Sequence, residues 1–166
     1  MPARSDTVAL VGLSTAVAVT DQFTKSLIVS AIGAGRLESR VEVVDSWLAL
    51  EYTQNRGVAF GLLSGLAPIL AAASVAILAG LVLLYIRQAT PSVWQTAATG
   101  LISGGALGNL IDRVRLGHVV DFLSVGPWPN FNIADSAITL GVLILIWGFT
   151  RPETTFGMAR ATDQGS

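Results

Sequence analysis

Long apolar stretches separated by short polar connections dominate this chain. Two of them, residues 57–86 and 88–111, contain no charged residue, and two others, near the ends, carry only a few polar residues. A membrane-spanning helix needs about 20 mostly apolar residues, and polar residues inside such a helix face protein or water. The pattern predicts four transmembrane helices, at about residues 8–30, 66–87, 92–112 and 131–150.

The composition agrees with a membrane protein. Of 166 residues, 52% are hydrophobic and 13% are charged, with a mean hydropathy of +0.63. This is more apolar surface than one soluble core can bury. We therefore expect a polytopic α-helical membrane protein, with residues 1–166 forming a single integral membrane domain. The polar tail, residues 151–166, is expected to be mobile.

Targeting, redox and charge signals narrow the function classes. The first apolar stretch could be a cleavable signal peptide, but apolar residues resume beyond Asp21 and Lys25 and complete a full-length span. The absence of cysteine excludes disulfides and thiolate nucleophiles. A net charge of -1 and the lack of a basic run indicate no nucleic-acid partner.

The connection between the first two helices reads differently from the rest. Residues 41–43 and 48–52 show a weak alternation of apolar residues, which predicts a small β-sheet within residues 36–56, lying on the membrane surface. An amphipathic loop is the alternative. Residues 112–130 contain glycines and prolines, so they cannot form one continuous helix, and they lie on the same face as the sheet.

Counting charges does not determine on which side of the membrane the termini lie. The face with both termini has four Lys or Arg residues and the opposite face has six, which would place the termini outside. Three of the six, Lys25, Arg56 and Arg113, lie beside carboxylates or asparagines and resemble site residues more than topological anchors.

Polar residues concentrate on that opposite face. Asp21 and Lys25 are four apart on one helix face and can pair, either as a brace for the first helix or as catalytic groups. Asn55 provides an amide near the interface, and Gly57 can supply a positive φ. The single histidine, His118, is expected to be a solvated loop residue rather than a catalytic base.

The third apolar stretch ends in a second polar group. Asn109, Asp112 and Arg113 follow at i, i+3 and i+4, so they share one side of a helix and can line a polar site. Glycines repeat every four residues before them, at Gly100, Gly104 and Gly108. This stripe predicts close packing of a neighbouring helix.

Two aspartates complete the set. Asp121 precedes a Gly-Pro-rich turn and Asp135 lies near the start of the fourth helix, so the chain can double back and bring both carboxyls together. Two adjacent carboxyls would share a proton, which suits water activation and amide hydrolysis without metal, thiol or serine. Alternatively, Asp135 serves the helix backbone and Asp121 pairs with Arg113 or Arg115.

Five motifs resemble those of one family, the lipoprotein signal peptidases (signal peptidase II) of bacteria. They are Asp21-Gln-Phe-Thr-Lys25, Asn55-Arg-Gly-Val-Ala-Phe60, Gly104-Gly-Ala-Leu-Gly-Asn-Leu-Ile-Asp-Arg113, Val119-Val-Asp-Phe122 and Phe131-Asn-Ile-Ala-Asp135. They occur in order and cover nearly the whole chain.

The resemblance implies a multi-pass protease of the bacterial cytoplasmic membrane. Both termini would be cytoplasmic, and the active site would face the extracytoplasmic side beside a small sheet and a mobile segment. The substrate would be a diacylglyceryl-modified prolipoprotein, cut just before the lipidated cysteine. Membrane lipids are further partners, and the cyclic peptide antibiotic globomycin would be an inhibitor. No metal or other cofactor is implied.

The resemblance also assigns roles to individual positions. Asp121 and Asp135 match the catalytic dyad, and Asn55, Asn109, Arg113 and Asn132 match polar residues around the substrate. A further group matches motif positions with supporting roles, namely Asp21, Lys25, Gly57, Gly108, Asp112 and Ala134. The rival classes are a transporter or channel with an intramembrane proton relay, a presenilin-like protease, whose aspartate motifs this chain lacks, and a structural adaptor.

Overall fold

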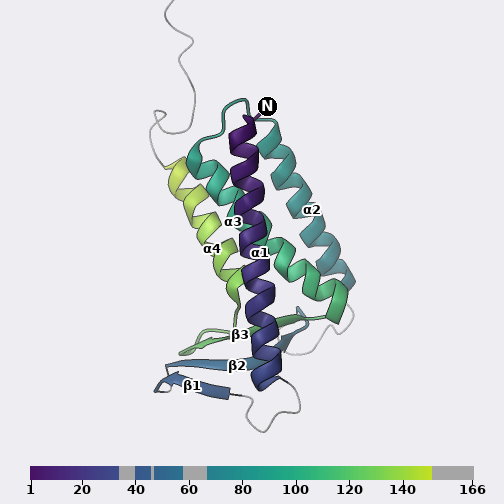
Figure 1. The fold of residues 1–166 in the computed structure, drawn as a ribbon, viewed down its shortest axis with the longest axis vertical. Helices are drawn as coiled ribbons and strands as arrows, with labels where there is room; N and C mark the ends of the chain where they lie inside the picture. Colours follow the sequence, from purple (N-terminus) through teal and green to yellow (C-terminus); the bar gives the residue numbers. More distant parts are fainter. Residues whose placement is uncertain (34–39, 46, 58–66, 151–166) are drawn as a thin grey trace, which may run out of the picture.

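The computed structural model describes residues 1–33, 40–45, 47–57 and 67–150. In chain order its elements are α1 (Arg4–Ile32), β1 (Arg40–Val44), β2 (Leu48–Asn55), α2 (Ala67–Ile86), α3 (Val93–Leu116), β3 (Val119–Val125) and α4 (Ile133–Phe149). Figure 1 shows a bundle of helices with the N-terminus at one end and the sheet across the other. Four helices and a small sheet are thus present, as predicted. The tail, residues 151–166, and residues 36–39 and 46 of the expected sheet region lie outside the described residues.

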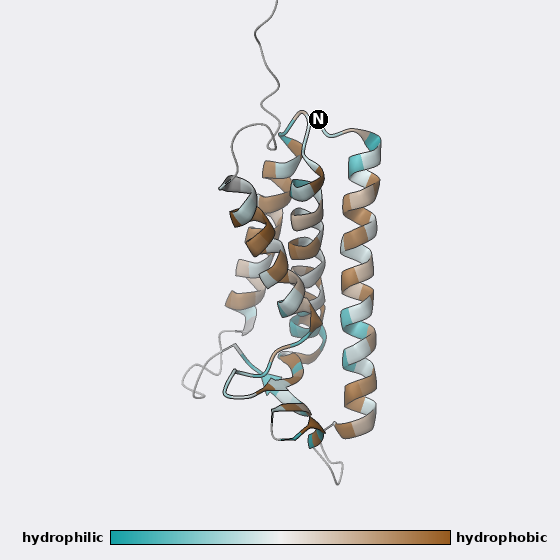
Figure 2. Cartoon of the chain, turned by 90° about the vertical axis from the view of Figure 1, so that its left-hand side faces the viewer, coloured by the Kyte–Doolittle hydropathy of each residue, from teal (hydrophilic) through white to brown (hydrophobic). Residues whose placement is uncertain are grey.

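The helices are apolar along most of their length (Figure 2). Two of them, Arg4–Ile32 and Pro68–Ile86, are long and apolar enough to cross a membrane, and Ile133–Gly148 is apolar but shorter. The remaining helix, α3, is less apolar because its last turns contain polar and charged residues. It extends to Leu116, beyond the predicted end near residue 112, and stops where Gly117 adopts a left-handed φ of 75°.

Glycines let α3 approach α1 closely. A Cβ on Gly104 would lie 2.6 Å from the backbone oxygen of Ser14, and one on Gly108 would lie 2.6 Å from Oδ2 of Asp21. Both distances are far below an ordinary carbon contact. The prediction that this glycine stripe packs against a neighbouring helix is confirmed, and the contact at Gly108 brings the α3 backbone against a site residue.

Strand β3 is the element that sequence reasoning missed. Residues 112–130 were treated as helix end and loop, whereas Val119–Val125 pairs antiparallel with β2 in a sheet of order β1-β2-β3. Val119, Val120, Asp121 and Phe122 are all buried, so the strand has no alternation of apolar and polar residues. A strand covered on both faces carries no period-two signal.

The register of β2 against β3 positions two site residues. Thr53 lies opposite Asp121 and Asn55 lies opposite Val119, after a register shift that follows Leu50. Phe122 packs against the end of α1 in a small apolar core with Ile28 and Ile32. The sheet is therefore anchored to the helical bundle at the level where the polar residues gather.

Candidate active site

The chain doubles back between Asp121 and Asp135, as the sequence predicted. Leu123 and Phe131 form a β-bridge in which each backbone N–H donates to the other's carbonyl, at 2.8 and 3.1 Å. Asp121 stands on β3, 2% exposed, and Asp135 lies in the first turn of α4, half-buried. Both carboxylates contact the same residue, Asn132.

Asn132 joins the two aspartates through different atoms. Its side-chain Nδ2 donates to Oδ1 of Asp121 at 2.7 Å, and its backbone N–H donates to Oδ2 of Asp135 at 3.3 Å. In return, the backbone N–H of Asp135 donates to Oδ1 of Asn132 at 2.9 Å. Asn132 and Asp135 thus form the capping box of α4. The alternative in which Asp135 serves the backbone is realised, but its other oxygen is engaged in the site.

The second oxygen of Asp121 is held by β2. Nδ2 of Asn55 donates to Oδ2 of Asp121 at 2.9 Å, and Oδ1 of Asn55 accepts from the backbone N–H of Gly57 at 2.8 Å. Gly57 has a φ of 85°, the left-handed conformation expected from the sequence. Asn55 is exposed, so it can also meet a bound molecule. The alternative pairing of Asp121 with Arg113 or Arg115 is absent among the described residues.

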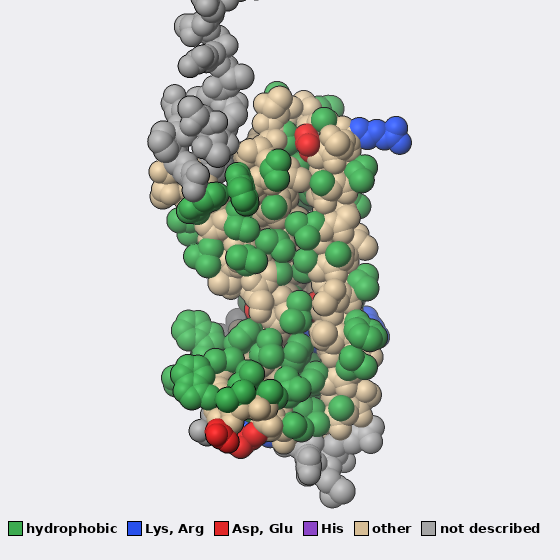
Figure 3. Space-filling model, turned by 60° about the vertical axis from the view of Figure 1, so that its left-hand side comes forward, with side chains coloured by type: hydrophobic (Ala, Val, Ile, Leu, Met, Phe, Trp, Pro, Cys, Tyr) green, Lys and Arg blue, Asp and Glu red, His purple; other side chains and the backbone are tan. Residues whose placement is uncertain are grey.

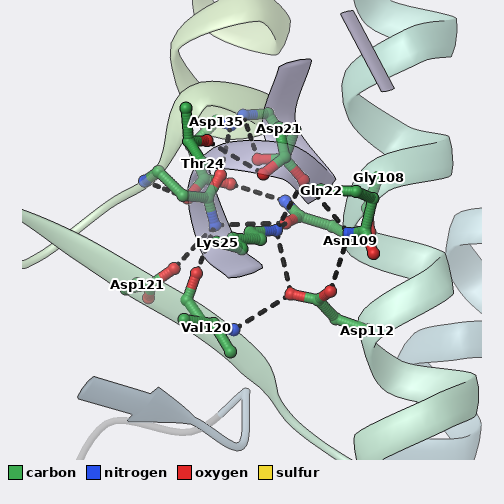
Figure 4. A network of polar contacts seen from close by, with 12 residues as sticks. Asp21, Gln22, Thr24, Lys25, Gly108, Asn109, Asp112, Val120, Asp121 and Asp135 are labelled. Atoms are coloured by element: carbon green, nitrogen blue, oxygen red, sulfur yellow. Dashed lines mark hydrogen bonds and ion pairs between the residues drawn. The ribbon is translucent and has the colours of Figure 1, made fainter. Parts of the chain in front are cut away.

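Asn109 connects this dyad to a separate ionic cluster. Its Nδ2 donates to Oδ1 of Asp135 at 2.7 Å, while its Oδ1 accepts from Nζ of Lys25 at 2.9 Å and from Nδ2 of Asn132 at 3.2 Å. The residue is 6% exposed. Figure 4 shows Lys25 at the centre of the network, with Asp121 and Asp135 on one side and Asp112 on the other.

The ionic cluster comprises Asp21, Lys25 and Asp112. Nζ of Lys25 lies 2.8 Å from Oδ2 of Asp21 and 2.9 Å from Oδ2 of Asp112, and all three side chains are almost fully buried. Such a cluster is maintained only when its charges are paired and its remaining hydrogen bonds are made.

The hydrogen bonds of the ionic cluster join four of the elements around the site. Asp21 accepts from the backbone N–H of Ala134 at 2.9 Å, and Asp112 accepts from that of Val120 at 3.0 Å. Gln22, which sequence reasoning passed over inside the first motif, donates to Oδ1 of Asp112 at 2.8 Å. α1, α3, β3 and α4 are thereby tied together. The brace interpretation of Asp21 and Lys25 accounts for these contacts.

Arg113 is not part of the ionic cluster. Its guanidinium donates to the backbone carbonyl of Asn109 at 3.3 Å, and within the described part of the chain it forms no ion pair. It is half-buried. Asn109, Asp112 and Arg113 share one helix end as predicted, yet only the first two belong to the buried network.

The electrostatics of Asp121 differ from those of an ordinary surface carboxyl. Burial, with a smaller contribution from the nearby Asp135 carboxyl, raises its pKa to about 6 in spite of the hydrogen bonds from Asn55 and Asn132, which lower it. Asp121 therefore retains a proton at mildly acidic pH. That is the behaviour expected for one member of a carboxyl pair that shares a proton.

A groove of about 380 Å³ opens beside Asp135. Its walls come from the outer face of α4 and the segment before it, namely Trp128, Phe131, Asp135, Ser136, Thr139, Leu140 and Leu143. Figure 3 shows this side of the molecule hollowed between the helices and the sheet and flanked by hydrophobic side chains. A single carboxylate in a mostly apolar groove suits an apolar ligand presented to a polar reacting group.

One expectation about the site is corrected. His118 is half-buried, and its Nε2 is buried without a hydrogen-bond partner in the described part of the chain, so it is not the solvated residue that was predicted. It lies between Gly117 and the buried start of β3, which withdraws the ring from solvent. The described residues contain no cluster of His, Cys, Asp or Glu suited to a metal ion.

Sequence comparison identifies the family. Residues 13–151 match the family model described as signal peptidase (SPase) II. The chain belongs to the signal peptidase II family. The lipoprotein signal peptidase of Halothermothrix orenii is 40% identical over 130 residues, covering 78% of this chain and 87% of the relative. That of Staphylococcus haemolyticus is 38% identical over 135 residues, covering 79% and 84%.

Solved structures agree with the sequence relatives. One bacterial membrane enzyme, determined by the in meso method, is 35% identical and superposes with a TM-score of 0.77, covering 86% of this chain and 92% of the other. A second is 32% identical with a TM-score of 0.76, covering 92% and 94%. The protein is therefore a membrane protease of this family, as the resemblance of its motifs indicated.

Proposed function

We propose that this chain is an aspartic endopeptidase that removes the signal peptide from diacylglyceryl-modified bacterial prolipoproteins, cutting just before the lipidated cysteine. The observation that carries the proposal is the pairing of Asp121 and Asp135 around Asn132 at the edge of an apolar groove. The name of the sequence relatives, lipoprotein signal peptidase, supports the substrate class.

In the proposed mechanism the aspartates divide acid and base work. Asp135, which lies in the first turn of α4 and whose Oδ1 accepts from Nδ2 of Asn109, acts as the base and takes a proton from water. The water oxygen attacks the scissile carbonyl, while protonated Asp121 donates a hydrogen bond to the carbonyl oxygen. The tetrahedral intermediate collapses as the proton held by Asp135 passes to the leaving nitrogen and the C–N bond breaks. The products are the carboxylate of the signal peptide and the free amine of the lipidated cysteine.

Other site residues hold the substrate in the proposed mechanism. Asn55 is exposed and Arg113 is half-buried, and both have more side-chain N–H groups than their present hydrogen bonds use, so we assign them to substrate carbonyls, which fixes the register of the peptide. Asn109 and Asn132 are buried, and we assign their contribution to the orientation of the aspartates. The supporting residues, including Gly108 and Ala134, hold α3 and α4 against Asp21.

The proposed orientation places the reaction at the membrane surface. All four helices span the bilayer, both termini are cytoplasmic, and the sheet end of the bundle is extracytoplasmic. A lipidated signal peptide then enters sideways from the bilayer into the groove along α4, with its acyl chains remaining among the membrane lipids. Globomycin, a cyclic peptide, would inhibit by occupying the same groove.

Cleavage of a defined substrate tests the proposal. Purified protein in detergent is expected to cut a diacylglyceryl-modified prolipoprotein before the modified cysteine and to leave the unmodified form intact. Asp121→Asn and Asp135→Asn are each expected to lower kcat by about 10³-fold or more, because neither amide can exchange the required proton.

The matched control is Asp45→Asn, which removes an exposed carboxylate at the end of β1 and should retain wild-type activity. A folded wild-type protein that leaves the lipidated substrate uncut would contradict the proposed activity. Cleavage that persists in either dyad variant would contradict the assignment of the aspartates.

A further inference from the structure

The three asparagines of the site share one feature: the amide oxygen of each faces a group that can only donate. Oδ1 of Asn55 accepts from the N–H of Gly57 at 2.8 Å, and that of Asn132 accepts from the N–H of Asp135 at 2.9 Å. Oδ1 of Asn109 accepts from the ammonium of Lys25 at 2.9 Å. Neither a backbone N–H nor an ammonium can accept a hydrogen bond, so the orientation of all three amides is determined.

As a consequence, each amide must present its NH₂ group to the dyad. Asn55 and Asn132 donate to the two oxygens of Asp121, and Asn109 donates to Oδ1 of Asp135 at 2.7 Å. Turning any of these amides over would set oxygen against carboxylate and donor against donor, which loses two hydrogen bonds, and for the buried Asn109 and Asn132 these could not be replaced by bonds to water.

The three donors differ in origin. Gly57 and Asp135 are two and three residues from the asparagines that they hold, so these two orientations follow from local chain geometry. Lys25 belongs to α1 and lies far along the chain from Asn109 on α3. The orientation of the Asn109 amide therefore depends on a tertiary contact.

Building on the proposed function, we propose that Lys25 is a positioning residue of the peptidase. By donating to Asn109 it keeps that amide donating to Asp135, which stabilises the ionised form of the carboxylate that takes the proton from water. This role goes beyond bracing the helices. The charged groups facing the site are Asp21 and Lys25 from α1, Asp112 and Arg113 from α3, Asp121 from β3 and Asp135 from α4.

The chain is suited to chemical replacement of this lysine. It contains no cysteine, so Lys25→Cys introduces a single thiol. A second pocket of about 340 Å³, whose lining includes Lys25, Ser26 and Arg115, shares no lining residue with the groove beside Asp135. A small alkylating reagent that approaches position 25 through this pocket does not enter the groove.

Two adducts of Lys25→Cys form the matched pair. Alkylation with 2-bromoethylamine rebuilds a lysine-like ammonium, and alkylation with 1-iodopropane gives a neutral chain of the same length. The readout is kcat, KM and the pH profile of kcat/KM on the lipidated substrate. The ammonium adduct is expected to match wild type within about threefold. In the propyl adduct, kcat should fall about tenfold or more with KM little changed, and the acidic limb should move about one pH unit higher.

A bracing role alone predicts a different result. Activity would then follow the amount of folded protein, and the two folded adducts would share the acidic limb of wild type, which would overturn the inference. If Lys25→Cys does not fold, the same adducts are made on Lys25→Cys/Asp112→Asn, which keeps the formal charge of the ionic cluster equal to that of wild type.

A second variant tests the hydrogen bond from Asn109 to Asp135 while Lys25 is retained. Asn109→Asp replaces the donor facing Asp135 by an acceptor, so its acidic limb must also move to higher pH, and an unmoved limb counts against the inference. Wild-type protein that fails to cleave would refute the proposed function itself. Wild-type cleavage with indistinguishable adducts would remove only the role of Lys25.

Discussion

Two pairs of carboxylates meet at Asn109, and they differ in what balances their charge. Asp21 and Asp112 contact the ammonium of Lys25 at 2.8 and 2.9 Å. Asp121 and Asp135 contact amide and backbone N–H groups, with no cation in contact among the described residues. A cation balances part of the charge of the first pair, whereas two neighbouring carboxyls without a cation gain by sharing a proton. The first arrangement braces the fold and the second can move a proton.

Removing the ammonium of Lys25 would leave neither pair of carboxylates with a cation. We expect this change to have the largest effect on stability. Lys25→Met leaves Asp21 and Asp112 buried without a counter-ion, so we expect the free energy of unfolding to fall by about 3–5 kcal/mol. Thermal unfolding in detergent measures the loss.

The control is an exposed ion pair of similar length, Arg40 with Glu51 at 2.9 Å, whose side chains are 40% and 36% exposed. Arg40→Ala should change stability by less than about 1 kcal/mol. Equal losses in Lys25→Met and Arg40→Ala would mean that burial does not distinguish the two ion pairs.

The next largest effect on stability and activity is expected when the orientation of Asn55, which donates to Asp121, is disturbed. Gly57→Ala puts a Cβ on a residue with a φ of 85°, against Cδ1 of Leu70, and strains the turn that orients Asn55 toward Asp121. We expect a loss of about 1–2 kcal/mol in stability and a comparable loss in transition-state stabilisation. Thermal unfolding and kcat/KM report the two effects.

Gly80→Ala is the matched glycine control, since a Cβ there meets nothing within 4 Å in the helix α2. Its activity should equal that of wild type. Wild-type kcat/KM in Gly57→Ala would indicate that the dyad does not depend on the orientation of Asn55.

The shared proton itself can be measured by pH. Burial and the neighbouring Asp135 raise the pKa of Asp121 to about 6, so the proton remains on Asp121 below that pH and leaves above it. Because the mechanism needs Asp121 protonated, kcat/KM is expected to fall above about pH 6, by roughly tenfold per pH unit. A profile that stays level up to about pH 8 would argue against proton sharing in the free enzyme.

The smallest expected effect is on activity, from a substitution of Arg113, which belongs to neither pair of carboxylates. Arg113→Lys keeps the charge but loses the planar, forked donor geometry that suits peptide carbonyls, so kcat/KM should fall about tenfold without a change in the unfolding temperature. The comparison is Arg115→Lys, which changes an exposed arginine two residues further along α3. Full activity in Arg113→Lys would exclude it from substrate positioning.

Much of the fold could be predicted because its signals are local. Long apolar stretches predicted the helices, and the glycine repeat ending at Gly108 predicted the close approach of α3 and α1, which the structure confirms. The left-handed φ of Gly57 was likewise expected. Each of these depends on spacing or backbone freedom within a few residues.

The errors arose where burial removed the local signal. Strand β3 is covered on both faces and shows no alternation, so residues 119–125 were read as a loop. Gln22 was passed over because its role depends on Asp112, which is distant in sequence. His118 was expected in solvent, but its Nε2 is buried beside the start of β3.

By itself, the sequence determined the helices, the sheet region and the family, because these follow from apolar length, turn chemistry and motifs read in order. It also predicted Asp121 and Asp135 as the two aspartates of the proposed site. Only the tertiary structure decided how the carboxylates are paired. Asn109 accepts from a lysine on one helix and donates to an aspartate on another. The direction of a buried hydrogen bond depends on which donors meet across the fold, and spacing along the chain does not specify that.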